Sequence, residues 1–305
     1  MRIVFIGQAP FGGESLEALL EQGEEVVGVI TVEDPPDPTY PNPVKDCAID
    51  HGIALYQANY LKKPEAIDWV GNLQPDLLVL AFVTTFVPKE MIDCATHGGI
   101  NYHPSLLPKY RGGSAINWAI INGETETGVT IHYIDEGVDT GPILLQEAVD
   151  ITSDDTAKSV YFKKLYPLGI RMIAEAVRQI REGTATSRSQ DESESSFQPV
   201  ITTNDTQIVW TQPTRQIYNL IRGANPSPGS VTSYDGRPYK FFDAAISDKN
   251  GSPGTIIDIG ESSFTVATGD GSVEILSAQI PGQKKQPAAD FIKAVGLKLA
   301  DRLES

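Results

Sequence analysis

The sequence has 305 residues, 40% of them hydrophobic and 8% aromatic, which is enough for one large domain and a smaller one with separate cores. The formal net charge is −16: residues 1–200 contain 14 basic and 29 acidic side chains, and residues 201–305 contain 10 and 11. An acidic surface repels polyanions, so nucleic acid is disfavoured as a partner unless the smaller domain carries a basic patch. A solvated surface that serves solubility is the simpler explanation of this charge.

The two cysteines, Cys47 and Cys94, lack the spacing of a metal site. We therefore expect reduced thiols and no bound zinc or iron. The apolar run MRIVFIG includes one charged residue and stops at Gly7, too short for a signal peptide or a membrane span. These features predict a cytoplasmic protein without a membrane partner, and they leave the oligomeric state open.

The first part of the chain alternates strand and helix patterns. The β-branched apolar runs at 2–7 and 26–31 flank LEALLEQG at helical spacing, which predicts a β-α-β unit and a parallel sheet. Later runs extend the series as strands at 76–82, 98–101, 127–134 and 142–149, with PEAIDWVGNL as an intervening helix. From residue 154 to 183 we expect one long helix that SDDT caps and that Pro167 kinks or breaks.

The rest of the chain predicts a second domain. Residues 184–203 are polar and rich in Ser and Thr, which indicates a linker. A short helix in QPTRQIYNLIRG and several short strands between glycine turns then favour a small β-barrel. We therefore predict an α/β catalytic domain over 1–183, the linker over 184–203, and a β-barrel domain over 204–305.

A histidine stands at a predicted strand end in NYHPSLLPKYRGG, because the proline after His103 favours extended backbone and an irregular loop follows. Asn101 lies two positions earlier and so shares the face of His103. Asp139, in the turn DEGVDTGP, joins them if the two loops meet at the carboxyl ends of neighbouring strands. An amide donor, an imidazole and a carboxylate around one small volume suit acyl transfer, which needs oxyanion stabilisation and proton transfer.

Plainer interpretations stay open at this point. A histidine beside a loop is more often structural than catalytic, and an aspartate before Thr-Gly is often a turn former. The opening GQAPFGG, with Gln8, is either a ligand-facing loop at a helix N-terminus or ordinary turn chemistry. Arg111 either binds an anionic group or caps backbone. We expect His51 and His97 at the surface or in packing, and His132 facing inward beside the site.

Two long motifs resemble the 10-formyltetrahydrofolate-dependent formyltransferases, a family typified by methionyl-tRNA formyltransferase: NYHPSLLPKYRG, followed by TGVTIHYIDEGVDTGPIL. Shorter similarities run nearly end to end, through VVGVIT, PNPVK, INGETETGVT, WTQPTRQIYNLIRGANPSPG and GDGSVEILSAQIPGQKK. The resemblance implies a Rossmann-like formyltransferase domain and a C-terminal OB-like β-barrel that helps to position the acceptor.

Asn101, His103 and Asp139 fall on the family's Asn-His-Asp triad. The resemblance implies that an acceptor amine attacks the formyl carbon of 10-formyltetrahydrofolate, that Asn101 and His103 stabilise the oxyanion, and that Asp139 moves protons from the amine to N10, without a metal or a covalent intermediate. It also implies that the pterin ring binds between two loops, with contacts expected at Phe82, Thr85, Phe86, Val87, Asp135, Glu136 and Asp139.

The acceptor is the open question. The longer basic loop of the tRNA enzymes is replaced by VEDPPDPTYPNPVK, whose only basic residue is Lys45 and whose carboxylates would repel an acceptor stem. The segment GGSAINW resembles the corresponding segment of the nucleotide-sugar N-formyltransferases and that of the hydrolase domain of 10-formyltetrahydrofolate dehydrogenase. The segment IGQAPFG also resembles that hydrolase domain. That domain usually has an aliphatic residue where this chain has Asn101, which favours transfer over hydrolysis.

We therefore expect a small amine such as an amino-sugar nucleotide, with methionyl-tRNA second and hydrolysis third. Lys284 and Lys285 keep tRNA open, because the family uses that region near nucleic acid, although a solvated turn also explains them. Gln8 and Arg111 are further candidates for acceptor contacts. A folate-binding module without turnover is disfavoured because the whole triad is present.

Overall fold

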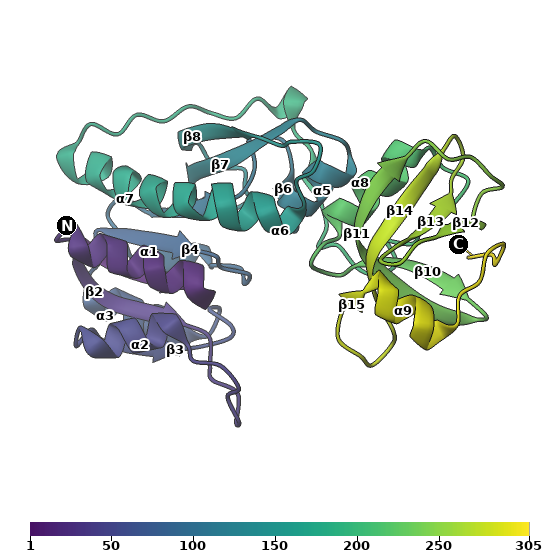
Figure 1. Cartoon of the computed structure of the whole chain (residues 1–305). Helices are drawn as coiled ribbons and strands as arrows, with labels where there is room; N and C mark the ends of the chain where they lie inside the picture. Colours follow the sequence, from purple (N-terminus) through teal and green to yellow (C-terminus); the bar gives the residue numbers. More distant parts are fainter. Residues whose placement is uncertain (305) are drawn as a thin grey trace. The chain divides into compact units, whose positions relative to one another are not determined.

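The computed structural model describes residues 1–304, which form two compact units. Unit 1 comprises residues 1–111, 128–149 and 163–197, and unit 2 comprises residues 112–127, 150–162 and 198–304 (Figure 1). The chain therefore passes between the units several times, and the contiguous boundaries at residues 183 and 203 stay a prediction. Within residues 1–304, no helix combines the length and the apolar character needed to span a membrane.

A seven-stranded sheet in the order β3-β2-β1-β4-β5-β7-β8 organises unit 1. Strands β1 to β5 pair in parallel, as predicted, whereas β7 runs antiparallel to β5. The segment between β5 and β7 begins and ends at the same end of the sheet, where β5 stops, so β7 runs back along β5 in the opposite direction. The strands are β1 (Arg2–Gly7), β2 (Glu25–Thr31), β3 (Leu55–Gln57), β4 (Leu77–Ala81), β5 (Gly99–His103), β7 (Glu126–Tyr133) and β8 (Ile143–Asp150).

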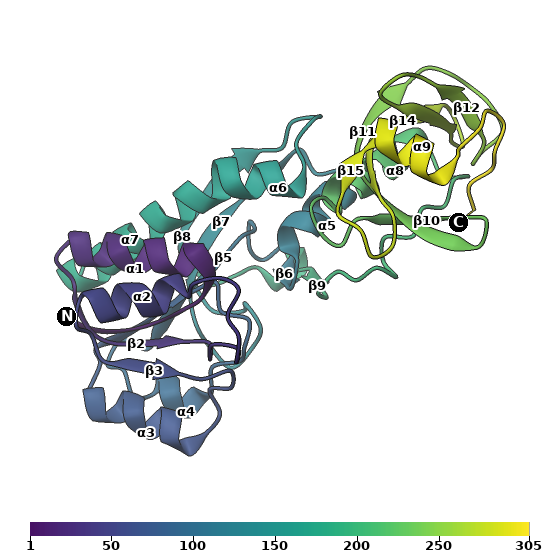
Figure 2. The ribbon, with the colours of Figure 1, turned by 60° about the horizontal axis from the view of Figure 1, so that its bottom comes forward.

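Helices cover both faces of this sheet (Figure 2). On one face lie α1 (Ala9–Glu21), α2 (Pro43–Asp50) and α7 (Tyr166–Glu182), with α1 packed against both of the others. On the other face lie α3 (Pro64–Leu73) and α4 (Lys89–Ile92). The buried side of α7 recurs every three or four residues, the period of an amphipathic helix, at Leu168, Met172, Ile173, Ala176, Val177 and Ile180.

The predicted helix over 154–183 is divided at the expected place. Thr156 and Ser159 form a capping box at the start of α6 (Ala157–Val160). A π-helical turn, Tyr161–Leu165, follows, and α7 begins next to Pro167. A proline is tolerated in the first turn of a helix because the hydrogen-bond donor it lacks would have no partner there.

Unit 2 contains an antiparallel sheet in the order β10-β11-β14-β13-β12, and β15 adds to β14. Glu304 bridges to Ser233 of β10, and Arg302 bridges to Thr255 beside β12, so the end of the chain joins the two edges of the sheet. Sheet and helices enclose a core rich in aromatic rings, among them Phe241, Phe264 and Phe291. This confirms the predicted fold class, an α/β domain with a C-terminal β domain.

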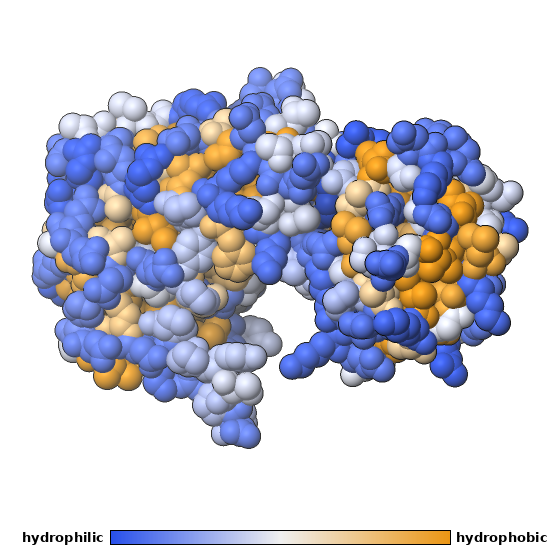
Figure 3. Space-filling view, in the orientation of Figure 1, coloured by the Kyte–Doolittle hydropathy of each residue, from blue (hydrophilic) through white to orange (hydrophobic). Residues whose placement is uncertain are grey.

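The remaining elements complete the chain. The sheet strands of unit 2 are β10 (Ser230–Tyr234), β11 (Arg237–Ser247), β12 (Ile256–Ile259), β13 (Phe264–Ala267), β14 (Ser272–Gln279) and β15 (Gln286–Pro287). Its further helices are α5 (Ala115–Ile121), α8 (Thr214–Gly223) and α9 (Ala288–Val295), and a short pair joins β6 (Arg111–Gly112) to β9 (Phe197–Gln198). Hydrophilic side chains cover most of the visible face, in line with the high net charge (Figure 3).

Candidate active site

Two of the predicted site residues lie at the end of β5. His103 is the last residue of this strand, as the proline after it predicts, and Asn101 shares its face. Across the β5–β7 ladder Asn101 pairs with His132, and His103 pairs with Thr130. The antiparallel register therefore brings a second histidine to the site.

A tight turn carries Asp139 to the same place. The Asp135 carboxylate accepts hydrogen bonds from the Gly137 N–H at 3.1 Å and the Thr140 hydroxyl at 2.5 Å, which closes the turn. Asp139 itself has a φ of +55°, in the left-handed region. At Gly141 a Cβ would lie 1.8 Å from the Tyr133 carbonyl oxygen, so only glycine fits there.

The structure brings the three predicted residues together around the Asp139 carboxylate, which is 13% exposed. One oxygen lies 3.4 Å from Nδ1 of His103. The other lies 3.4 Å from Nδ2 of Asn101 and 3.4 Å from Nε2 of His132. His132 is thus a fourth member of the site, which sequence reasoning placed nearby but without a role.

The proton position on His103 follows from its partner. Its Nε2 lies 2.8 Å from the carbonyl oxygen of Tyr110, and a carbonyl only accepts, so Nε2 carries the hydrogen. The nitrogen that faces Asp139 is therefore Nδ1.

His132 orients the amide of Asn101 in the same way. Its Nδ1 lies 2.8 Å from the Tyr133 carbonyl oxygen and donates to it, which leaves Nε2 of the neutral ring as an acceptor. Nδ2 of Asn101 lies 3.3 Å from that Nε2. Two acceptors, His132 and Asp139, therefore fix the N–H₂ end of the amide inside the site.

Burial lowers the pKa of His103 below its ordinary value, and the negative charge of Asp139 opposes this only in part. Near neutral pH, Nδ1 thus presents a lone pair beside a carboxylate. Two acceptors that converge on one small space form a good receiver for a single proton.

We expect the His103 imidazole to titrate below the ordinary pKa of about 6.5, because burial is the largest cause of its shift. In an Asp139→Asn variant the pKa falls further, since the main opposing charge is removed. The imidazole ¹⁵N and ¹H chemical shifts followed against pH measure both values. A His103 pKa above that of free imidazole would contradict this electrostatic description.

The segment predicted as a linker fastens both sides of the site. Gln190 donates from Nε2 to the carbonyl oxygens of Asp139 and Gly141, each at 2.8 Å. Ser196 accepts at Oγ from the N–H of Tyr110 at 2.8 Å, next to the carbonyl that binds His103. The contact between Gln190 and Asp139 could not be predicted from the sequence, because the two residues are 51 positions apart.

Arg111 turns inward to the same segment. Its guanidinium donates to Gln190 Oε1 at 2.8 and 3.1 Å and forms a two-point ion pair with Glu192 at 2.7 and 2.9 Å. The side chain is 8% exposed. Contact between Arg111 and an acceptor stays a prediction. In the structure, the partners of the Arg111 guanidinium are Gln190 and Glu192.

The other acceptor candidates lie elsewhere. Gln8 precedes α1 and donates from Nε2 to the Thr84 hydroxyl at 3.2 Å. In unit 2, Lys285 pairs with Asp243 at 2.5 Å, and its ammonium lies 5.0 Å from the centre of the Phe242 ring. Lys284 is exposed. These roles in acceptor binding stay predictions.

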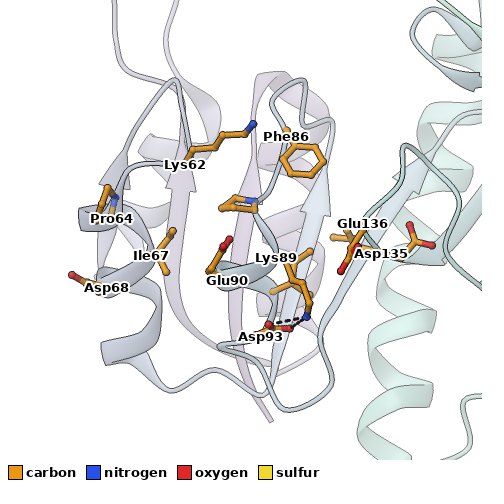
Figure 4. A pocket seen from close by; sticks show the side chains of 13 residues that line it. Lys62, Pro64, Ile67, Asp68, Phe86, Lys89, Glu90, Asp93, Asp135 and Glu136 are labelled. Carbon is orange, nitrogen blue, oxygen red and sulfur yellow. Dashed lines mark hydrogen bonds and ion pairs between the residues drawn. The ribbon is translucent and has the colours of Figure 1, made fainter.

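A cavity of about 880 Å³ in unit 1 lies between α3, α4 and the loops after β4 and β7 (Figure 4). This volume is within the usual range for small-molecule sites. Phe86 extends from one predicted folate loop, and Asp135 and Glu136 extend from the other. Apolar walls come from Pro64, Ile67, Pro88, Ile92 and Ile134.

Three other residues predicted to bind folate, Phe82, Thr85 and Val87, do not line this cavity. Thr85 lines a second, much smaller cavity together with Gln8. Val87 is buried in the hydrophobic core beneath the loop. Phe82 has a φ of +61° and an exposed ring. Folate contacts at these positions stay predictions.

An amide, two imidazoles and a carboxylate at the end of a Rossmann-like sheet are the groups that a group-transfer enzyme needs for oxyanion stabilisation and proton transfer. Comparison with known proteins gives the family. The Formyl transferase family matches residues 1–176, and the Formyl transferase C-terminal domain family matches residues 200–296. The chain therefore belongs to the formyltransferase family, and it is an enzyme that uses 10-formyltetrahydrofolate.

Full-length relatives include two methionyl-tRNA formyltransferases. The protein of Geobacter metallireducens is 36% identical over 99% of this chain and 98% of its own length. The protein of Trichlorobacter lovleyi is 38% identical over 99% of this chain and 96% of its own length.

Solved structures share the fold. An N-formyltransferase from Helicobacter canadensis, in complex with folinic acid and dTDP-3-aminofucose, has a TM-score of 0.69 at 22% identity over 90% of this chain and 97% of its own. HypX from Aquifex aeolicus in complex with tetrahydrofolic acid has a TM-score of 0.69 at 20% identity over 96% of this chain and 47% of its own.

Proposed function

We propose that the protein transfers a formyl group from 10-formyltetrahydrofolate to the amino group of methionyl-tRNA. The observation that carries this proposal is similarity along the whole chain, C-terminal domain included, to enzymes named methionyl-tRNA formyltransferase. The similarity to a sugar N-formyltransferase structure is at 22% identity, which supports the fold alone.

The preference for a small amine, drawn from the acidic loop after β2 and from the segment GGSAINW, is thus not supported. These two short segments weigh less than similarity along the whole chain. Within the loop, Asp34 is ion-paired with Lys45 at 2.5 Å, so part of its charge is neutralised locally. Residues 201–305 are nearly balanced in charge, and a polyanion meets less repulsion there.

The proposed chemistry uses the proton positions described above. The unprotonated acceptor amine attacks the formyl carbon. As the pair of Asp139 and His103 takes up a proton, one N–H of Asn101 turns from the Asp139 carboxylate, 3.4 Å away, to the oxyanion, and the other N–H stays on Nε2 of His132. The proton lost by the attacking nitrogen passes to the pair of Asp139 and His103, where Nδ1 holds it beside the carboxylate. The same proton then moves to N10 as the carbon–N10 bond breaks, and tetrahydrofolate leaves.

His132 has a supporting task in this mechanism. By accepting from Asn101, it keeps the amide nitrogen turned towards the reacting carbon and away from alternative orientations. The cavity beside Phe86 is the proposed folate site, because apolar side chains in its wall, such as Ile67 and Ile134, suit a flat ring, and because its loop after β7 leads to Asp139. Charged side chains, among them Lys62, Lys89 and Glu90, share this wall.

The acceptor is tested by following tetrahydrofolate release from 10-formyltetrahydrofolate in three parallel reactions: with charged initiator methionyl-tRNA, with a panel of amino-sugar nucleotides, and without acceptor. Turnover that depends on the charged tRNA supports the proposal. Turnover with a sugar amine alone would restore the small-amine prediction, and turnover without an acceptor would indicate a hydrolase.

Replacing Gln190 tests the role of the segment around it. We expect Gln190→Leu and Gln190→Glu each to lower kcat about tenfold or more, because both remove the donors to the Asp139 and Gly141 carbonyls that fix the turn. Gln190→Glu keeps acceptors for Arg111, so normal activity in this variant would show that only the contact with Arg111 matters. Gln207→Leu, at an exposed glutamine that also donates to a backbone carbonyl, is the matched control.

A further inference from the structure

Three side chains, one on α1, one on α2 and one at the C-terminal cap of α2, form a cluster that the proposed reaction does not use. Cys47 Sγ lies 3.2 Å from Glu17 Oε2, and His51 Nε2 lies 3.2 Å from the same oxygen. The three donor atoms all lie within 4.8 Å of one another. They offer one sulfur, one nitrogen and one oxygen to a single point in space.

Local packing explains why these residues meet. Cys47 lies on α2, and His51 is the residue that caps the C-terminal end of this helix, four positions later; the His51 N–H donates to the Cys47 carbonyl oxygen, which keeps the two residues on one side of the helix. Gly13 of α1 approaches Pro43 so closely that a Cβ on this glycine would lie 2.8 Å from the proline Cβ. One turn further along each helix, the same close approach sets Glu17 beside Cys47.

We propose that Glu17, Cys47 and His51 bind a divalent transition-metal ion of the zinc type. Zinc binds thiolate, imidazole and carboxylate at about 2.0–2.3 Å, and tetrahedral geometry then separates the donor atoms by about 3.3–3.5 Å. Two of the three separations, Sγ to Oε2 and Nε2 to Oε2, are 3.2 Å and close to these values. The third, Sγ to Nε2, is at most 4.8 Å, so binding draws the Cys47 and His51 side chains together by no more than about 1.5 Å.

The surroundings leave the ion accessible. The His51 side chain is 41% exposed and the Glu17 side chain 45% exposed, so a hydrated cation reaches the cluster from solvent and one position stays available for water. On binding, the Cys47 thiol releases its proton to solvent and binds as thiolate. The bound ion would cross-link α1 to α2 on one face of the sheet.

This inference differs from the expectation of no metal, which rested on the spacing of the two cysteines. The spacing of two cysteines indicates only sites that both of them share. The fold instead brings one cysteine, Cys47, together with a carboxylate and an imidazole, from Glu17 and His51. Cys94 lies elsewhere, with its Sγ 3.2 Å from the carbonyl oxygen of Glu90. It therefore serves as an internal control.

The test uses Co²⁺ as a probe, added to the full-length, metal-stripped and reduced protein. We expect one equivalent to bind with a thiolate-to-cobalt absorption band and tetrahedral visible bands, and Zn²⁺ to displace it. Cys94→Ser retains both features. Cys47→Ser loses the charge-transfer band, and His51→Gln raises the dissociation constant about tenfold or more.

Thermal unfolding gives an independent readout on the same proteins. Zn²⁺ is expected to raise the melting temperature of the parent protein and of Cys94→Ser, but not of His51→Gln. Circular dichroism of each variant without metal verifies that the fold is retained. Cobalt binding without a sulfur band, or equal affinity in the parent and Cys47→Ser, would overturn the proposal.

Discussion

Replacing Asp139 by asparagine is expected to lower kcat for formyl transfer by about 10²–10⁴-fold. The substitution preserves size but removes the carboxylate that lies 3.4 Å from Nδ1 of His103, so the proton from the attacking amine has no charged receiver. Folate affinity is expected to stay near that of the parent protein, because the turn is held mainly by Asp135 and Gln190.

Rapid-quench single turnover, combined with equilibrium binding of folate, separates these two effects. Asp248→Asn, at an exposed position in unit 2, is the matched control and should behave like the parent protein. If Asp139→Asn retained full turnover, the proton route through this carboxylate would be wrong.

Replacing Asn101 by alanine is expected to lower kcat by about 10²–10³-fold, the usual effect of removing one oxyanion donor. Asn101→Asp should be at least as severe, because it adds a negative charge near the oxyanion and beside Asp139, whose oxygen lies 3.4 Å from Nδ2. Both variants are also measured in single turnovers with saturating folate and acceptor, so that the observed rate reports the chemical step and not product release. Asn250→Ala, at an exposed asparagine, is the control.

The two Asn101 variants also separate a loss of the donor from a loss of shape. Alanine removes the amide altogether, whereas aspartate keeps its outline. Near-normal kcat in Asn101→Ala would place oxyanion stabilisation elsewhere in the site. Full activity in Asn101→Asp would exclude a developing negative charge near this position.

Local patterns predicted the elements that carry the site. The proline after His103 predicted the end of β5, and Pro167 predicted the break before α7, because a proline limits its own backbone and that of its neighbour. Apolar runs predicted the strands of the sheet, since burial on both faces requires them. The antiparallel orientation of β7 was not predicted, because the direction of a strand depends on the end of the sheet at which the preceding connection stops.

The meeting of Asp139 with Asn101 and His103 was predicted, but other contacts between distant residues were not. His132 meets Asn101 through the register of two strands, and Gln190 meets Asp139 across 51 residues of chain. The cluster of Glu17 and Cys47 depends on how closely two helices pack. Such contacts follow from tertiary packing, and they cannot be predicted from residue spacing or composition alone.

The proposed reaction is direct formyl transfer to the amine of methionyl-tRNA at the site of Asn101, His103 and Asp139. Its most direct test is a single turnover with 10-formyltetrahydrofolate carrying an isotopic label in the formyl group, in the presence of charged initiator methionyl-tRNA. The label is predicted to appear on the methionyl amine in step with tetrahydrofolate release in the parent protein, and far more slowly in Asp139→Asn. Label recovered as free formate, or transferred at the same rate in both proteins, would contradict the account.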